Sequence, residues 1–273
     1  MKPSLRSGER LAYRLLLLAL VAVVAVGAAL LAPASLAAPD ATTGKRTAAA
    51  SESVPAQYRG KIIRKRVRYF PKKLLALTFD DGPSTNITPQ VLRVLEKHGA
   101  KATFFVLGRS VKAHPEIVRQ AAQAGHAIGV HSYSHPSRAT AAQAASELDR
   151  TAALIAQVTG KQPVLFRPPY GITNGNLCRL ALKRNYSVIL WTISSADSNP
   201  IGSATIARNT IHTPNPGDIV LMHDAAGKKA TLGALPQILT ELSAAGFRFV
   251  TVPELMRAWD EWEKTQQRTK HAK

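Results

Sequence analysis

The sequence predicts an α/β fold in which parallel strands form a closed or nearly closed barrel. Between residues 74 and 260, a short apolar run, a turn and a helical segment recur seven times. The apolar runs are continuous rather than alternating, which is typical of parallel strands buried on both faces. Seven such units in one domain favour a barrel, and a doubly wound open sheet is the alternative arrangement.

The expected strands are short runs rich in β-branched, aromatic and other apolar residues. They are residues 74–79, 102–107, 126–130, 163–167, 186–192, 218–222 and 247–252. Helix start and stop signals separate them, because Pro follows the first position of several segments and Gly ends them. The clearest of the expected helices span residues 88–99, 114–125, 140–160 and 230–246, and a last helix begins at Pro253.

The first 37 residues have the layout of a secretory signal peptide. Four basic residues precede an uncharged run over residues 15–31, and Ser35-Leu36-Ala37 offers a small-x-small cleavage site. The run also approaches the roughly 17–25 residues that span a bilayer, so an uncleaved membrane anchor is the alternative. Both versions predict an exported protein, which is periplasmic, cell-wall-associated or secreted, or anchored to the membrane by residues 15–31.

Charge separates the rest of the chain into segments. Residues 38–73 are expected to form a basic, flexible linker, and residues 58–73 hold eight Lys or Arg and no acid. The main domain is expected over residues 74–260, followed by a polar tail over residues 261–273. The formal net charge of +19 predicts an anionic partner. For an exported protein, an anionic cell envelope or membrane surface is favoured over nucleic acid, and the oligomeric state is left open.

Polar residues follow the expected strands, one strand after another. In parallel βα architectures the functional site lies at the carboxyl ends of the strands, so these residues are expected to share one rim. They are Asp80, Asp81, His131, His135, Arg167, Tyr170, Asp197, His223 and Asp224. The lone Cys178 allows neither an intramolecular disulfide nor a cysteine-based metal site, and it is expected to be a buried structural thiol.

The rim residues suit metal-dependent hydrolysis. His131 and His135, together with one aspartate, would form a two-histidine, one-carboxylate site with open positions, as catalytic divalent metals require. Zinc is the default metal, and cobalt or another first-row metal remains compatible. The second aspartate is then available to accept a proton from water. Core histidines and helix-capping aspartates are the competing interpretation, which the shared rim disfavours.

Five motifs then match a known family. "TFDDGPS", "HSYSHP", "FRPPYG", "SADSN" and "VLMHD" resemble, in order, the motifs of the polysaccharide deacetylases, the NodB-homology domain of carbohydrate esterase family four. The resemblance covers residues 74–259 and implies a distorted (β/α)7 barrel that removes N-acetyl groups from sugars with a divalent metal. One position departs: Ser198 follows Asp197 where family members commonly carry Trp, which puts the aromatic wall of the acetyl pocket in doubt.

The resemblance implies a role for each matching residue. Asp80 would be the general base, held by Arg167, and His223 would be the general acid, held by Asp197. The expected metal ligands are Asp81, His131 and His135. The expected substrate-binding residues are Tyr170, whose backbone would help hold the oxyanion, Pro169, Leu221 in the acetyl pocket, and Trp191 as a substitute for the missing aromatic wall.

The sequence thus predicts an exported deacetylase that acts on N-acetylglucosamine-type residues, with peptidoglycan preferred because the envelope is anionic. Chitin oligomers, another N-acetylated polysaccharide or an O-acetyl ester are alternative substrates. The alternative that is not an enzyme is an envelope protein that binds glycans without hydrolysing them.

Overall fold

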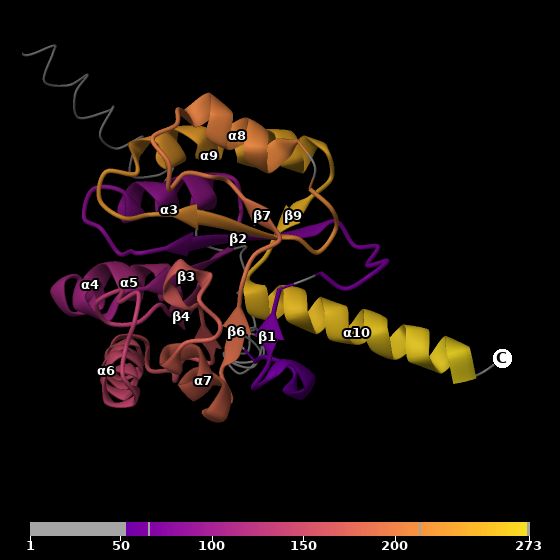
Figure 1. Cartoon of the computed structure of the whole chain (residues 1–273). Helices are drawn as coiled ribbons and strands as arrows, with labels where there is room; N and C mark the ends of the chain where they lie inside the picture. Colours follow the sequence, from indigo (N-terminus) through magenta and orange to yellow (C-terminus); the bar gives the residue numbers. More distant parts are fainter. Residues whose placement is uncertain (1–52, 65, 213, 272–273) are drawn as a thin grey trace, which may run out of the picture. The chain divides into compact units, whose positions relative to one another are not determined.

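The structure is a computed structural model that describes residues 53–64, 66–212 and 214–271 (Figure 1). The expected signal peptide or anchor, and residues 38–52 of the expected linker, lie outside the described residues. None of the helices in the described part of the chain combines the length and the apolar composition needed to cross a membrane.

The strands of the described chain form one parallel sheet. They are β1 (Ile62–Ile63), β2 (Leu74–Asp80), β3 (Ala102–Val106), β4 (Ala127–Val130), β5 (Leu165–Phe166), β6 (Ser187–Ile189), β7 (Ile193–Ser194), β8 (Ile219–His223) and β9 (Arg248–Phe249). Their order is β1-β6-β5-β4-β3-β2-β8-β7, and β9 pairs with the first residues of β2. Each of the seven expected runs therefore contains a strand.

The sheet winds in one direction rather than two. From β2 to β6, each strand lies beside the next strand in the chain, as in a barrel. The expected strand over residues 186–192 is split: β6 pairs with β5, whereas β7, only three residues later, pairs with β8 at the other side of the sheet. The chain thus bridges the two sides, and the curled sheet is consistent with a distorted (β/α)7 barrel.

Helices follow the strands and cover the outer face of the sheet (Figure 1). They are α3 (Thr88–Lys97), α4 (Gly108–Ala113), α5 (Pro115–Gln123), α6 (Ala141–Thr159), α7 (Asn176–Lys183), α8 (Ser203–Ile211), α9 (Lys229–Ala244) and α10 (Val252–His271), with short 3-10 turns at η1 (Ala56–Tyr58) and η2 (Pro169–Gly171). Thr140 begins α6 with a capping box, in which its hydroxyl accepts from the Gln143 N–H and Gln143 accepts from the Thr140 N–H.

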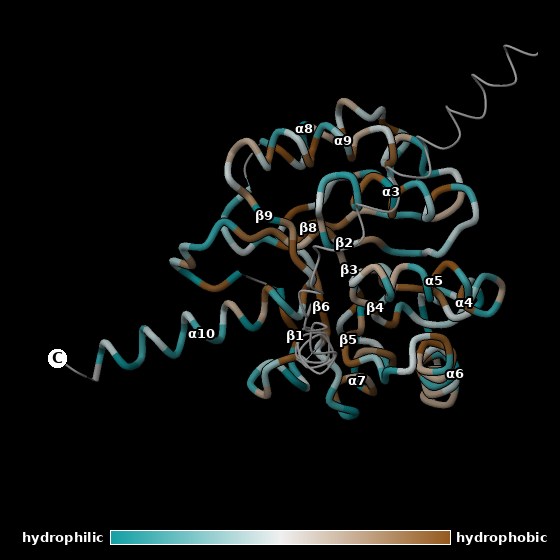
Figure 2. The backbone as a smooth tube through the Cα atoms, turned by 180° about the vertical axis from the view of Figure 1, so that it is seen from behind, coloured by the Kyte–Doolittle hydropathy of each residue, from teal (hydrophilic) through white to brown (hydrophobic). Residues whose placement is uncertain are grey.

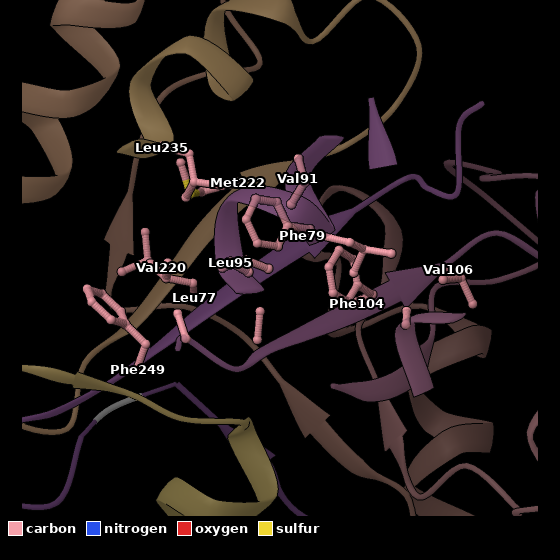
Figure 3. Packing of buried hydrophobic residues seen from close by; sticks show 14 of the residues in the cluster. Leu77, Phe79, Val91, Leu95, Phe104, Val106, Val220, Met222, Leu235 and Phe249 are labelled. Atoms are coloured by element: carbon pink, nitrogen blue, oxygen red, sulfur yellow. The ribbon is translucent and has the colours of Figure 1, made fainter. Parts of the chain in front are cut away.

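The alternation of strand residues decides what faces the helices and what faces the interior of the curled sheet. Leu77 and Phe79 of β2 pack outward against Val91 of α3 and Leu235 of α9 (Figure 3). Successive strand residues point to opposite faces, so Asp80 points inward. Figure 2 shows that hydrophobic residues gather in the strands at the centre of the domain, whereas the surrounding turns are mostly hydrophilic.

A second apolar cluster fills the interior at the end away from the rim. It combines strand residues with the first turns of α10, and it includes Ala76, Phe105, Leu165, Ile189, Ile219, Leu255, Met256 and Trp259. Apolar side chains thus close this end of the interior, and the expected site residues lie at the opposite end, where the strands finish. The remainder of α10 extends away from the sheet (Figure 1).

The described part of the expected linker differs from the flexible segment that its charge suggested. Ile62 and Ile63 form β1, which pairs with β6, and Val54, Ile63 and Phe70 are buried. The physical reason is that β6 would otherwise present unpaired backbone groups at a sheet edge. The expected polar tail is helical, since α10 continues to His271, and residues 264–270 are exposed.

The central position of β2 leads to a stability prediction. Leu77 is fully buried between the sheet and the helices, so Leu77→Ala should lower the free energy of unfolding by about 2–5 kcal/mol. Urea unfolding followed by circular dichroism measures this loss. The control is Leu180→Ala on α7, where the side chain is only partly buried and the loss should be less than half as large. Equal losses would contradict the outward packing of β2.

Candidate active site

The carboxyl ends of neighbouring strands bring the expected site residues together. Asp80 ends β2 and lies directly across from His223, which ends β8. His131 follows β4 and Arg167 follows β5, and these two strands are also neighbours. The four side chains therefore meet at one rim, as the sequence predicted for parallel strands.

Asp80 and Arg167 form a buried ion pair. Arg167 Nη1 lies 2.8 Å from Asp80 Oδ1, and the two residues are 0% and 3% exposed. The guanidinium also donates to the Thr78 hydroxyl and to the carbonyls of Ile189 and Leu190. Because all three guanidinium nitrogens of Arg167 have partners, the arginine is fixed in place and holds the Asp80 carboxylate in a fixed direction.

The position of Arg167 depends on Gly129 of β4, the strand next to β5. The guanidinium carbon lies 4.2 Å from the centre of the Phe105 ring, which supports it from below. A Cβ atom on Gly129 would come within 2.7 Å of that ring. Gly129 thus leaves the space that Phe105 needs, and Phe105 in turn supports the arginine.

Asp81, His131 and His135 form a potential metal site. Asp81 Oδ1 lies 3.6 Å from His131 Nε2 and 3.4 Å from His135 Nε2, and the three donors lie within 4.8 Å of one another. Two donors that bind one zinc at 2.0–2.1 Å in tetrahedral geometry are roughly 3.3 Å apart, so these separations fit. Asp81 Oδ1 is also buried without a hydrogen-bond partner in the described chain, and a cation would satisfy it.

The protonation of the histidines also fits a metal. His131 Nδ1 lies 2.8 Å from the Arg167 carbonyl, which can only accept, so Nδ1 carries a proton and Nε2 is the nitrogen that faces Asp81. Burial lowers the pKa of His135, although Asp81 opposes this, and the neutral ring is the form that binds metals. One carboxylate and two imidazoles leave coordination positions open for water and substrate.

His223 and Asp197 form the second polar pair of the rim. His223 Nδ1 lies 2.8 Å from Asp197 Oδ1, and the His223 N–H donates to Asp197 Oδ2 at 2.7 Å. Burial by itself would lower the pKa of His223, but the hydrogen bond to Asp197 and the negative charges of Asp80, Asp197 and Asp81 raise it above its ordinary value. The imidazole is thereby suited to carry a proton near neutral pH.

The motif "SADSNP" is also compatible with an ordinary turn, but the structure gives Asp197 more contacts than a turn residue needs. It is buried, and it also accepts a hydrogen bond from the Thr231 hydroxyl on α9. Burial opposes ionisation of Asp197, but its bonds to His223 and Thr231 prevail, and its pKa is lowered. Ser198, the position that departs from the family pattern, is exposed beside it.

The expected substrate-binding residues lie around this rim. Tyr170 is 64% exposed, and its ring packs edge-on against His135 with ring centres 4.5 Å apart. Pro169 is buried beside it, and Leu221 lies on β8 two residues before His223. Trp191 follows β6, with its ring centre 5.8 Å from the Arg167 guanidinium carbon.

The structure adds a residue that the sequence did not single out. Glu147 on α6 accepts hydrogen bonds from the Tyr133 and Ser134 N–H groups and from the Ser134 hydroxyl, at 2.7–2.8 Å. These donors lie in the loop between His131 and His135. Glu147 therefore holds the loop that carries both candidate metal ligands.

Asp224 was expected at the rim without a role, and the structure gives it a structural environment. It is fully buried, accepts from the Thr88 hydroxyl at 2.6 Å, and burial raises its pKa to about 7. A Cβ on Gly82 would fall 2.4 Å from its carboxylate oxygens. Asp224 thus packs against the turn that follows Asp80 and Asp81, and only glycine fits there.

Together, the curled parallel sheet and its rim define a class of α/β barrel that can hold a divalent metal between a base and an acid. The family model described as "Polysaccharide deacetylase" matches residues 68–189. A peptidoglycan-N-acetylglucosamine deacetylase of Bacillus cereus is 34% identical over 192 residues, which are 69% of this chain and 70% of that protein. The chain belongs to the polysaccharide deacetylase family.

Two solved structures extend the comparison. Peptidoglycan deacetylase PdaC from Bacillus subtilis superposes with a TM-score of 0.67 at 32% identity, over 73% of this chain and 98% of that chain. PdaC is named as a peptidoglycan-N-acetylmuramic acid deacetylase, of which this chain covers 39%. BA3943 from Bacillus anthracis, described as a pseudoenzyme of carbohydrate esterase family four, gives a TM-score of 0.63 at 28% identity, over 69% of this chain and 66% of that chain.

The contacts of Glu147 predict a role in metal affinity. Glu147→Ala removes all three hydrogen bonds that hold the ligand loop and should weaken zinc binding by about 10–100-fold, the usual effect of losing a residue that orients metal ligands. Titration calorimetry of the metal-free protein with zinc measures the affinity.

Two further variants control this experiment. Glu147→Gln keeps an oxygen that can accept from the loop and should recover most of the affinity. Glu96→Gln, an exposed carboxylate on α3, should leave it unchanged. A Glu147→Ala protein that binds zinc as tightly as the wild type would show that the loop holds its ligands without this support.

Proposed function

We propose that this protein is a metal-dependent deacetylase that hydrolyses the acetamide of N-acetylglucosamine-type residues in peptidoglycan, releasing acetate and leaving a free amine on the sugar. The observation that carries the proposal is the rim itself, where two histidines and an aspartate lie beside an arginine-held carboxylate and an aspartate-held histidine. These are the parts that amide hydrolysis requires.

In this proposal Asp81, His131 and His135 hold the metal, with zinc as the first candidate and cobalt or another first-row metal as alternatives. When bound, the metal supplies Lewis acidity, which lowers the pKa of the attacking water and polarises the acetamide carbonyl. The donor separations and the unpartnered Asp81 oxygen support this assignment.

Asp80 is the general base of the proposed reaction. It accepts a proton from the water that attacks the acetamide carbon, and its pairing with Arg167 fixes the direction of the carboxylate. The backbone N–H of Tyr170 is proposed to donate to the oxygen that becomes negative in the tetrahedral intermediate. Leu221, Pro169 and Trp191 are proposed to contact the acetyl group or the sugar.

His223 is the general acid. Collapse of the tetrahedral intermediate breaks the carbon–nitrogen bond, and His223 gives its proton to the departing sugar amine. Asp197 fixes the Nδ1–H of His223 and stabilises its charged form. The base and the acid lie on neighbouring strands, at paired positions of β2 and β8, so they can act on the same bound acetamide.

Peptidoglycan is proposed as the substrate because the Bacillus relatives are named for it and because the chain carries a formal charge of +19, which suits an anionic envelope. We propose accordingly that the protein is exported, with residues 1–37 as signal peptide or anchor, residues 74–260 as the catalytic domain, and no nucleic-acid partner. The names of the relatives include both N-acetylglucosamine and N-acetylmuramic acid, so the sugar has to be measured.

Chitin oligomers, another N-acetylated polysaccharide and O-acetyl esters use the same chemistry and remain alternative substrates. A glycan-binding protein without turnover is the other candidate, since the pseudoenzyme BA3943 shares the fold. A mutant of BA3943 has restored activity, so activity within this fold depends on particular residues. This chain has the base, the acid and the three metal ligands, which favours an enzyme.

Acetate release tests the proposed function directly. The full-length protein, loaded with zinc or cobalt, should release acetate from peptidoglycan, and a chelator should abolish the release. Asp80→Asn keeps the shape but cannot accept the proton, so kcat should fall by at least about 100-fold. The control Asp149→Asn changes an exposed carboxylate on α6 and should retain activity. Binding to peptidoglycan without acetate release by the metal-loaded wild type would favour the non-catalytic candidate.

The His223–Asp197 pair predicts a pH effect. The general acid must be protonated, and the negative charge of Asp197 raises the pKa of His223. In Asp197→Asn this pKa falls, so the alkaline limb of the pH profile of kcat/KM should move to lower pH by about 1 unit or more. The control Asp260→Asn on α10 should leave the limb in place. An alkaline limb that stays in place in Asp197→Asn would exclude this pair as the proton donor.

A further inference from the structure

A groove opens directly from the candidate metal site. Asp81 and His135 line it, together with residues that follow β2, β3 and β8, which are neighbouring strands of the sheet. These segments begin where their strands end, so the groove lies on the rim itself. Its volume is about 550 Å³, within the roughly 300–1,000 Å³ that is common for ligand pockets.

The two candidate metal ligands that line the groove are also the more accessible ones. The side chains of Asp81 and His135 are 25% and 20% exposed, whereas that of His131 is only 3% exposed. The groove therefore leads to the side of the metal site that a substrate can reach.

Arg109 on α4 gives the groove a positive charge. Its side chain is exposed and forms no hydrogen bond or ion pair with the described residues. Apart from Asp81, which the proposed metal would neutralise, no acidic residue of the described chain lines the groove. At the other end of α4, His114 also lines the groove and lies 3.8 Å from Glu116. The arginine is thus left free to bind an anion.

The backbone at Arg109 is held against the metal-ligand loop. The N–H groups of Gly108 and Arg109 donate to the carbonyls of Ser132 and Tyr133 at 2.9 and 3.1 Å. A Cβ on Gly108 would fall 2.5 Å from the Tyr133 ring, so this close approach requires glycine. Because the two carbonyls belong to the loop that carries both histidine ligands, Arg109 has a fixed place beside the metal site.

The charge of Arg109 also acts on the metal site. Burial lowers the pKa of His135 most strongly, and the positive charge of Arg109 lowers it further. A glycan bound with its acetamide at the metal ligands would therefore bring its neighbouring groups into the field of this arginine.

We propose that Arg109 binds a carboxylate of the glycan in this groove and thereby selects acidic substrates over neutral ones. The proposal rests on the proposed function and adds a specificity-determining residue to the same site. A guanidinium matches a carboxylate with two parallel hydrogen bonds. In peptidoglycan the carboxylate can belong to the lactyl ether of a sugar or to a stem peptide, and both offer the same chemistry.

Three oligomers with the same number of sugars test the proposal on the metal-loaded, full-length protein. An N-acetylglucosamine oligomer is neutral, a peptidoglycan oligomer without stem peptides carries lactyl carboxylates, and one with stem peptides carries peptide carboxylates. In R109A, kcat/KM for at least one acidic oligomer should fall about fivefold relative to the neutral oligomer, mainly through KM. The acidic oligomer that shows the loss identifies the source of the carboxylate.

Two variants control this comparison. R109K retains the charge and should recover part of the loss. R119A removes an exposed arginine of α5 that does not line the groove, and it should behave like the wild type. An effect of Arg109 on the metal alone would lower kcat/KM equally for all three oligomers, because each presents an acetamide. Unchanged ratios of acidic to neutral kcat/KM in R109A would therefore overturn the proposal.

Direct binding separates this proposal from the proposed function. Titration calorimetry with zinc-loaded D80N, which lacks the proposed base, measures binding without turnover. R109A/D80N should bind the same acidic oligomer about fivefold more weakly than D80N and the neutral oligomer equally well. Equal affinities for the acidic oligomers overturn the role of Arg109 even if the wild type releases acetate. Weaker binding without acetate release by the wild type would support that role and contradict the proposed function.

Discussion

The buried contact between Asp80 and Arg167 is the interaction on which the remaining structure of the rim depends. Removing two charges from water is costly and is offset only if their remaining hydrogen-bonding groups are satisfied. Here Thr78 on β2 and the carbonyls at the end of β6 accept the remaining hydrogen bonds of Arg167, and the Phe105 ring on β3 packs against the guanidinium. Groups from several strands meet in this way only if the sheet curls, so the curvature and the ion pair require each other.

This arrangement explains how two adjacent carboxylates can coexist. Neighbouring like charges repel unless each has its own counter-charge. Asp80 still belongs to β2 and points inward to the arginine, whereas Asp81 has a φ of 71° and has left the strand. The change of direction between the two residues turns the second carboxylate toward His131 and His135. One backbone turn therefore separates the two partners, a guanidinium for Asp80 and the proposed metal for Asp81.

Much of this could be read from the sequence. Continuous apolar runs predicted parallel strands, and polar residues after successive runs predicted a shared rim. The structure brings Asp80, Asp81, His131, His135, Arg167 and His223 together there. β1 escaped notice because a two-residue strand has no periodicity, and the run over residues 186–192 gave no sign that it divides between two partners. Glu147 resembled any helical acid, since its three donors are backbone and hydroxyl groups of a distant loop that no spacing rule connects to it.

The pairing of β1 with β6 also affects how the chain acquires this rim. Ile62 pairs with Val188, and β2 pairs with β8. Strands at the start of the domain therefore gain their partners only when segments much later in the chain are present. Such distant pairings slow folding, because the entropy cost of closing a long loop comes before the stabilising contacts form. A chain that emerges from its amino end first would hold Ile62 and Ile63 without their strand partner until β6 had followed. The early part of the chain is thus assembled late.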